Sequence, residues 1–219
     1  DLRKFGGKQK QYLRADGILV LDTAGNVKWK WNLLDVFDPK TLPEKIDPTH
    51  SLGHANSISI ADDGNYLVSF RDFSQVWKID SKSGAIIWKL GKGGDFALDD
   101  EYYFMRQHSV YQTRDGAIMI FDNGDRRTRP FSRILAFRLN EKEMKAEVTV
   151  NVKLSSDLSA DKMCSAEEME KGKYLVCTSK RSGILSVVDD AGNELWRVDT
   201  TYPSYRAYFV KDPFVVPGR

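Results

Sequence analysis

Residues 57–90 read SISIADDGNYLVSFRDFSQVWKIDSKSGAIIWKL and contain four short apolar segments separated by turn signals. Apolar and polar residues alternate along these segments, which is typical of β-strands. The intervening residues are rich in Asp, Asn, Ser and Gly, which favour tight reversals of the chain. The stretch therefore predicts four consecutive strands: Ser57–Ile60, Tyr66–Phe70, Gln75–Ile79 and Ala85–Leu90.

The same pattern recurs on both sides of this stretch. Before it, Ile18–Leu21 and Val27–Trp31 flank a turn and predict a hairpin. After it come two further units of four strands, and the first turns of the three units carry Gly64, Gly116 and Gly172, which are 52 and 56 residues apart. Units of four short strands at a period of about 50 residues are typical of β-propeller blades. The sequence thus predicts an all-β fold of the propeller type.

The units predict one domain over residues 1–219, a partial β-propeller of about three and a half blades. Its parts are a blade remnant at 1–35 and blades at about 54–91, 108–154 and 164–210. Propellers usually close with about four to eight blades. We therefore expect missing N-terminal blades or a second chain to complete the ring. The alternative is a four-bladed ring in which Tyr205–Val210 supplies the missing strand.

Tryptophan recurs at the end of the units. Trp29, Trp88 and Trp196 each lie in the last strand of a unit, after a turn that contains glycine. A repeated tryptophan is more often packed between blades than in contact with a ligand. We expect these three side chains to be structural.

The two cysteines, Cys164 and Cys177, flank a turn at residues 170–173 and so lie on two arms of one hairpin. Whether they pair depends on the register, because a turn centred on Lys171 and Gly172 leaves them diagonal. The sequence leaves two possibilities open: a disulfide, which would indicate an oxidising compartment, and two free thiols in the core.

The composition is that of an ordinary globular protein, with 41% hydrophobic residues, 29% charged residues and a net charge of +2. Lysines and arginines are scattered among acidic residues, which argues against a nucleic-acid-binding surface. The sequence lacks an apolar run that could span a membrane and begins without the apolar segment of a signal peptide. We expect no membrane span, and either a cytosolic protein or one whose leader was removed. The densest basic cluster, Arg126–Arg129, predicts a solvated loop or an anion-attracting rim.

Two histidines occupy equivalent places in neighbouring units. His54 comes just before the innermost strand of its unit, and His108 does the same in the next unit. Innermost strands of a propeller meet at its axis, so both imidazoles are expected to point into the central channel. Arg71 and Asn123 follow the next strand of the same two units, and antiparallel pairing would return them to the same mouth. Two imidazoles, a guanidinium and an amide form a set that suits an oxyanion.

Other chemistries fit poorly. His50 and His54 have the spacing of metal ligands on a helix, but Pro48 and Gly53 disfavour a helix at that place. We therefore expect no metal site. The sequence contains no phosphate-binding loop, dinucleotide-binding motif or nucleophile elbow in a fitting context, and we expect no cofactor.

Four segments together resemble the arylsulfotransferases, a family of six-bladed aryl-sulfate sulfotransferases: HANSISIADDGNYLVSFR at 54–71, VWKIDSKSGAIIWKLG at 76–91, QHS at 107–109 and FDNGD at 121–125. The similarity covers most of residues 15–125 and extends more weakly to Tyr205 and Arg206. It implies that this chain is the C-terminal part of such a propeller. The implied reaction moves a sulfuryl group from a phenolic sulfate donor to a phenol acceptor through a sulfated histidine, without a nucleotide sulfate donor.

The resemblance also implies roles for single residues. By motif match, His108 would be the nucleophile, and His54 and Arg71 would bind the sulfate oxygens. Asn56 would orient the pocket, and the residues implied in substrate binding are Asn56, Asn123, Tyr205 and Arg206. The family has a further histidine in an earlier blade, and nothing before His54 supplies it, so activity is expected only with the missing blades present. Family members are usually exported, which implies a periplasmic or secreted protein.

Two other functions remain open at this point. One is a non-catalytic propeller that scaffolds or binds a protein or polysaccharide. The other is a quinoprotein-like oxidoreductase, which needs a redox cofactor and a metal.

Overall fold

Antiparallel β-strands make up nearly all the regular structure of the protein. The computed structural model describes residues 9–10, 14–37, 51–180 and 182–211. The strands form three four-stranded sheets and one hairpin, and a short parallel pair joins β1 (Arg14–Ala15) to β4 (Ser51–Leu52). The prediction of an all-β fold with four-stranded units is confirmed, whereas the six-bladed ring and the single domain over 1–219 stay predictions.

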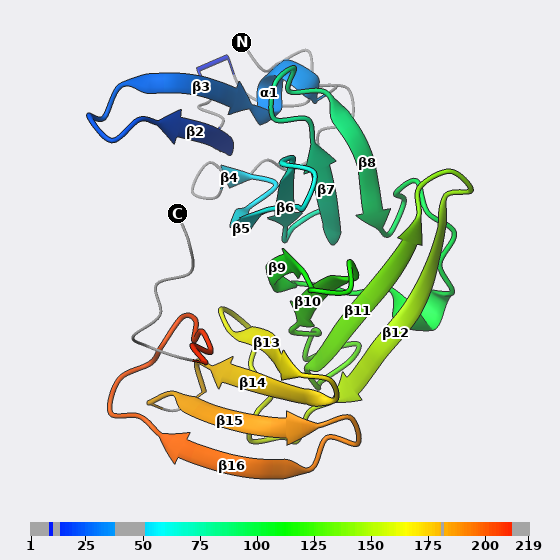
Figure 1. Ribbon diagram of the computed structural model, residues 1–219, viewed down its shortest axis with the longest axis vertical. Helices are drawn as coiled ribbons and strands as arrows, with labels where there is room; N and C mark the ends of the chain where they lie inside the picture. Colours follow the sequence, from blue (N-terminus) through cyan, green and yellow to red (C-terminus); the bar gives the residue numbers. More distant parts are fainter. Residues whose placement is uncertain (1–8, 11–13, 38–50, 181, 212–219) are drawn as a thin grey trace.

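Each sheet is built from strands that are consecutive in the sequence, and we name the sheets I to IV (Figure 1). Sheet I is the hairpin of β2 (Gly17–Leu21) and β3 (Val27–Asn32). Sheet II contains β5 (Ala55–Ile60), β6 (Tyr66–Phe70), β7 (Gln75–Ile79) and β8 (Ile86–Gly91). Sheet III contains β9 (His108–Gln112), β10 (Ile118–Asp122), β11 (Arg133–Asn140) and β12 (Lys145–Lys153). Sheet IV contains β13 (Ser165–Glu170), β14 (Lys173–Thr178), β15 (Ile184–Asp189) and β16 (Glu194–Asp199).

In the described residues, helix is confined to short pieces. The one-turn helix α1 (Leu33–Val36) follows sheet I, and the side chain of Asn32 caps it by accepting from the Leu34 N–H. A 3₁₀ turn, Asp100–Tyr102, lies between sheets II and III. Among the described residues no helix has the length and apolar character needed to cross a membrane.

The turn between β5 and β6 shows how the sequence sets the strand ends. The Ala61 N–H donates to the Asn65 carbonyl at 2.8 Å, and Gly64 adopts a φ of +82° that favours glycine. The two strands then pair from Ala55 opposite Phe70 to Ile60 opposite Tyr66. His54 and Arg71, which flank these pairs, consequently lie at the same end of sheet II.

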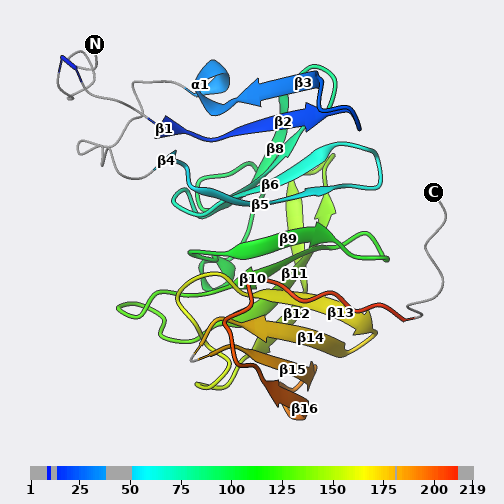
Figure 2. The same ribbon diagram turned by 90° about the vertical axis from the view of Figure 1, so that its left-hand side faces the viewer.

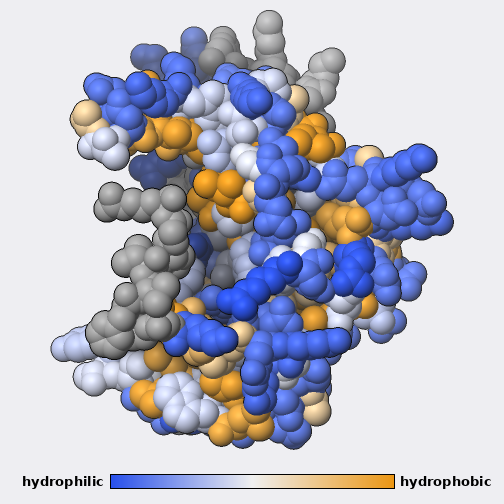
Figure 3. Space-filling model, in the orientation of Figure 1, coloured by the Kyte–Doolittle hydropathy of each residue, from blue (hydrophilic) through white to orange (hydrophobic). Residues whose placement is uncertain are grey.

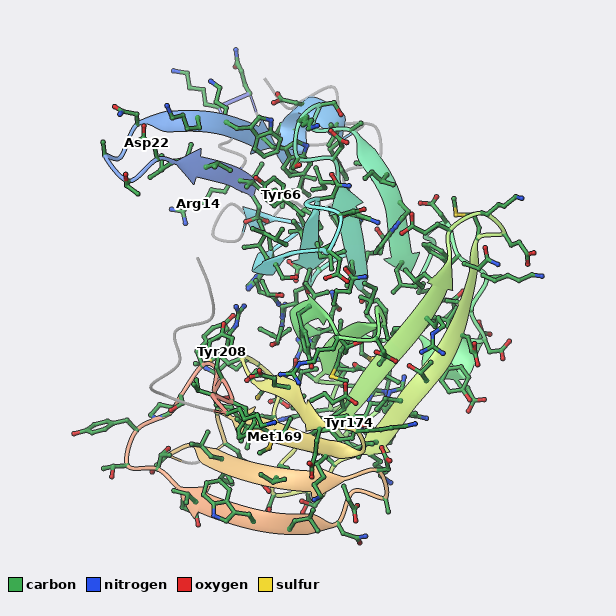
Figure 4. The ribbon with its side chains drawn as sticks, in the orientation of Figure 1. Arg14, Asp22, Tyr66, Met169, Tyr174 and Tyr208 are labelled. Atoms are coloured by element: carbon green, nitrogen blue, oxygen red, sulfur yellow. The ribbon has the colours of Figure 1, made fainter. Side chains whose placement is uncertain are left out.

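The sheets pack side by side around a common centre, with β5, β9 and β13 nearest to it (Figures 1 and 2). Three apolar clusters fill the spaces between successive sheets, and their large members are Trp31, Phe70 and Trp77; Trp88, Leu90 and Phe137; and Phe121, Tyr174 and Val176. Tyr66 also lies between sheets I and II, where its ring is 5.4 Å from that of Trp29 (Figure 4). Burial of these faces is the main stabilising contribution to the arrangement.

The three repeated tryptophans differ in how far their side chains are buried. Trp88 is 1% exposed between sheets II and III, and Trp29 is half-buried, packs on Tyr66 and donates to the Lys82 carbonyl. Trp196 is instead 49% exposed. Among the described residues no sheet packs against β16, so the packing of Trp196 between blades stays a prediction. Apolar surface is visible over sheet IV and beside the hairpin in Figure 3.

The C-terminal segment does not complete a sheet. Sheet IV has its four strands by Asp199, and residues 205–210 are not part of any strand. The predicted blade at 164–210 is therefore shorter, and the four-bladed ring closed by Tyr205–Val210 is not formed. At the other end, most of the predicted blade remnant before Arg14 lies outside the described residues.

Both cysteines are buried free thiols. Ser165 pairs with Cys177 across the hairpin, so Cys164 is diagonal to Cys177 and the disulfide alternative is not realised. The two thiols make separate contacts, Cys164 with the Lys162 carbonyl and Cys177 with the Ser204 carbonyl. Burial raises the pKa of Cys177 to about 11, which keeps this thiol protonated at neutral pH.

Candidate active site

His108 is the first residue of β9 and lies opposite Phe121 on β10. The register shifts beside this pair, and Arg106 and Ser109 have φ values of +55° and +56°. Such conformations cost about 1–3 kcal/mol each in non-glycine residues and persist only where the surrounding structure holds them. The irregular backbone turns the imidazole of His108 inward, and the residue is only 3% exposed.

Three hydrogen bonds fix the protonation of His108. Its Nδ1 lies 2.9 Å from the Arg106 carbonyl and 2.8 Å from Asn123 Oδ1, and its Nε2 accepts from the Met163 N–H at 3.1 Å. The orientation of the Asn123 amide is set because Nδ2 donates to the carbonyls of Ala160 and Met163. Since both partners of Nδ1 are acceptors and the partner of Nε2 is a donor, the proton is on Nδ1 and the lone pair on Nε2.

The surroundings also keep this imidazole neutral. Burial lowers the pKa of His108 to about 4, and the charges of Arg71 and His54 act in the same direction. The hydrogen bonds to Asn123 and Arg106 oppose this shift but do not overcome it. At neutral pH His108 therefore presents an unprotonated Nε2 in an electropositive setting.

His54 and Arg71 come from the corresponding end of sheet II. His54 has a φ of +51° directly before β5, and its carbonyl accepts from the Arg71 N–H at 3.2 Å. The guanidinium of Arg71 forms an ion pair of 2.7 Å with Asp72. The structure thus brings His54 and Arg71 together at one end of sheet II, within electrostatic range of His108.

Asn56 links the two sheets. Its Nδ2 donates to the Gln107 carbonyl at 2.7 Å, and its own carbonyl accepts from Tyr205 Oη at 3.3 Å and Arg206 Nη2 at 3.1 Å. Within the described part of the chain, Asn56 Oδ1 and Arg206 Nε are buried without a hydrogen-bond partner. Buried polar atoms are rarely left unpaired, so this place has hydrogen-bonding capacity that the described residues do not use.

The C-terminal segment passes this site at Tyr205 and Arg206, which contact Asn56 of β5, and then runs beside β13 (Figure 2). The N–H groups of Ala207 and Phe209 donate to Ser165 Oγ and Glu167 Oε2. Tyr208, on the same segment, lies in front of sheet IV in Figure 4. This course places the ring of Tyr205 edge-on to His108, with 6.1 Å between the centroids.

All seven residues predicted for the site thus lie around His108 and Asn56, but Asn123 differs from the others. Both ends of its amide are used by the protein, Oδ1 by His108 and Nδ2 by two carbonyls. Asn123 is therefore a positioning residue that holds the imidazole of His108. No motif predicts the Met163 contact, because any residue except proline can offer a backbone N–H.

Gln107 is a second contributor that the sequence did not reveal. It is fully buried, and its Nε2 donates to Ser69 Oγ and to the carbonyls of Phe70 and Gln75. These bonds tie the residue before His108 to β6 and β7. The sequence feature that could have singled out Gln107 is its position directly before His108.

A buried ion cluster supports the end of β10. Asp122 is fully buried and accepts from Arg129 Nη2 at 2.5 Å and Arg133 Nε at 2.9 Å. The basic cluster at 126–129 is thus divided: Arg129 is inside and paired, whereas the Arg126 side chain is 80% exposed. In the described residues, no group of three His, Cys, Asp or Glu side chains is arranged to hold a metal ion, and His50 lies outside them.

Comparison with known proteins shows the family to which the chain belongs. A solved structure of a protein of unknown function from Bacteroides caccae is similar, with a TM-score of 0.54 and 16% identity over 84% of this chain and 54% of that chain. This likeness shows the fold alone, and the present chain spans about half the length of that protein. No curated protein matches. The family model described as arylsulfotransferase matches residues 2–186. Because this match covers well over half of the sequence, the chain belongs to the arylsulfotransferase family.

Proposed function

We propose that this chain forms the sulfuryl-transfer site of an aryl-sulfate sulfotransferase that moves a sulfuryl group from a phenolic sulfate ester to a phenol. The observation that carries the proposal is the buried neutral imidazole of His108, whose Nδ1–H tautomer leaves the lone pair on Nε2. A neutral imidazole is a competent nucleophile, and its low pKa keeps it so at neutral pH.

In the proposed first step, Nε2 of His108 attacks the sulfur of the donor. The bond from sulfur to the phenolic oxygen breaks, and the phenolate leaves with the electron pair. In the second step the oxygen of a phenol acceptor attacks the sulfur of the sulfated histidine, the bond from sulfur to Nε2 breaks and the neutral imidazole is regenerated. The proton of the acceptor passes through solvent to the phenolate that left in the first step. No nucleotide sulfate donor takes part.

Charge on the transferred group needs donors fixed in place. Arg71 and His54 supply positive charge or N–H donors on the side of sheet II, and the unpaired Nε–H of Arg206 offers one more. Donors that are already oriented stabilise the developing charge without further reorganisation. Asn56 and Tyr205 hold Arg206 and flank the donor in this proposal.

Attack also requires a local movement. Nε2 accepts from the Met163 N–H, so this hydrogen bond has to open before the lone pair can reach sulfur. Met163 and Cys164 have φ values of +61° and +80°, which are strained conformations for non-glycine residues. In the proposal the loop shifts when the donor binds, and the freed N–H donates to an oxygen of the sulfuryl group.

The proposal extends to the assembly that contains the site. Sheets I to IV are part of a six-bladed propeller whose remaining blades, from a longer chain or a second chain, supply the further family histidine. The family is generally exported, and we place the protein in the periplasm or outside the cell.

The test uses p-nitrophenyl sulfate as donor and phenol as acceptor. We expect release of nitrophenolate, and a rapid-quench digest should show the mass of one SO₃ group on the peptide that contains His108. His108→Asn should abolish both signals. His54→Asn is the matched control, because it should slow transfer while still allowing the label to form on His108.

Two results would contradict the proposal: a folded full-length protein, with all its blades present, that transfers nothing, or a His108→Asn variant of it that is as active as the parent. The first would favour the non-catalytic propeller. Folding of each variant is checked by its thermal unfolding curve.

A further inference from the structure

A large cavity lies beside the candidate active site, between sheets III and IV. Its volume is about 810 Å³, within the range of about 300–1,000 Å³ that is usual for small-molecule sites. The walls come from the loop after β10, the loop between β12 and β13 and the loop after β14. These loops lie at the same end of sheets III and IV as the start of β9, so the cavity is on the same side as His108. We call it the basic pocket.

Four cationic side chains and one carboxylate line the basic pocket: Arg126, Arg129, Lys162, Lys180 and Asp161. Two of the cations already have carboxylate partners. Arg129 is paired with the buried Asp122, and Arg126 is paired with Asp161 at 2.5 Å.

The other two cations have no such partner among the described residues. The ammonium group of Lys180 contacts the Ser156 carbonyl, which is neutral. Across the described ranges, neither Lys162 nor Lys180 forms an ion pair with a carboxylate. The hydroxyls of Ser156, Ser159 and Ser179 add polar groups to the same wall. The pocket therefore has uncompensated positive charge together with hydroxyl groups, a combination that suits an anion.

The pocket is joined to the nucleophile by direct contacts. Asn123 lines the pocket and also binds Nδ1 of His108. Lys162 directly precedes Met163, whose N–H lies on Nε2 of the same imidazole. An anion held by Lys162 would therefore act on the loop that has to move before attack.

We propose that the basic pocket binds an anionic substituent of the phenolic substrate, so that the preferred phenols carry a carboxylate or sulfonate besides the reacting oxygen. This inference rests on the proposed sulfuryl transfer for its substrate. The selection of an anion follows from the two ammonium groups, which have no carboxylate partner in the part of the chain that the structure describes, and from the hydroxyls around them.

The first experiment compares two acceptors of similar size, 4-hydroxybenzoate and 4-methylphenol, with p-nitrophenyl sulfate as donor. In the double variant Lys162→Gln/Lys180→Gln, KM for 4-hydroxybenzoate should rise about tenfold, because hydrogen bonds to a charged group are lost. KM for 4-methylphenol should stay unchanged. Added salt should reduce the difference in wild type, since exposed charges are screened.

The matched control is Lys142→Gln/Lys171→Gln. It removes the same charge at two exposed lysines. Both lie in turns at the ends of sheets III and IV that are opposite to the basic pocket. The control should leave both KM values unchanged. Equal changes for the two acceptors in the pocket variant, or no change for either, would overturn the inference.

A binding measurement separates this inference from the proposed function. Benzoate has no phenolic oxygen and cannot accept a sulfuryl group, so its binding by calorimetry does not depend on catalysis. Loss of benzoate binding in the pocket variant, but not in the control, would support the anion site even if no transfer is found. Equal benzoate binding by all variants would overturn it. Inorganic phosphate serves as the probe for a free anion. The pocket variant could lose phosphate binding while its KM for 4-hydroxybenzoate stays the same as that of wild type. This combination would also overturn the role of the pocket in binding the substrate.

Discussion

At the scale of single residues, the candidate site depends on how one imidazole is held. The sequence predicts His108, His54 and Arg71 at one mouth because each flanks a strand of a repeated unit. It does not predict the tautomer of His108, which follows from Asn123 on one side and the Met163 N–H on the other. These contacts join residues 15 and 55 positions apart, and their formation depends on how the loops pack.

The pKa of His108 gives a prediction about stability. The folded protein holds a neutral imidazole with a pKa of about 4, whereas the unfolded chain takes up a proton near 6.5. The lowered pKa therefore costs stability in acid: the free energy of unfolding keeps its full value, as far as His108 is concerned, above about pH 6.5. It falls by about 3 kcal/mol in total as the pH is lowered toward 4. We expect the free energy of unfolding of wild type to fall relative to that of His108→Asn over this range, as measured by urea titration at several pH values.

The His108→Asn variant is the control for all other titrating groups, because these groups cancel in the difference. Identical pH profiles for the two proteins would contradict the prediction. So would a pKa near 6.5 for His108 in the folded protein, measured by nuclear magnetic resonance.

At the scale of strands and sheets, the predicted strands agree with the observed ones to within a few residues. Alternation and turn residues act locally, so they can be recognised without knowledge of the fold. Their packing differs from one sheet to the next. Trp88 and Trp196 have the same place in their units, yet one is 1% exposed and the other 49% exposed. The physical difference is the neighbour: sheet III covers β8, and no described sheet covers β16.

These two tryptophans give a matched pair of substitutions. Trp88→Ala removes a ring that packs against Phe96 in the core between sheets II and III, and it should lower the free energy of unfolding by about 3–5 kcal/mol. Trp196→Ala should lower it by about 1 kcal/mol or less, because the side chain is half exposed. Chemical denaturation of the two variants checks this. Equal losses would show that another surface covers Trp196 in solution.

At the scale of the whole molecule, the sheets leave two apolar faces open. The hairpin exposes Leu19, Leu21 and Val27 at 49–59%, and β16 exposes Leu195, Trp196 and Val198 at 41–51%. In a closed propeller such faces are covered by the adjoining blades. Exposed apolar surface of this kind promotes association.

We therefore expect the isolated 219-residue chain to self-associate in a concentration-dependent way. Leu195→Lys/Trp196→Lys should shift it toward the monomer in sedimentation velocity experiments, because two charges oppose burial of the face. Met144→Lys is the control, since Met144 is 38% exposed in a turn at the end of β11. A chain that is monomeric at all concentrations, or that responds equally to both changes, would contradict the prediction.

The sequence by itself determined the all-β class, the four-stranded units, the positions of their turns and the set of polar residues at the strand ends around His108. These properties follow from the period of two along each strand and from turn residues, which act over a few positions. Only the tertiary structure decided which atoms those residues meet. The Met163 N–H on His108, the inward ion pair of Arg129 with Asp122 and the basic pocket between sheets III and IV all arise where separate loops pack together. Such contacts depend on the packing of distant segments, which no local pattern encodes.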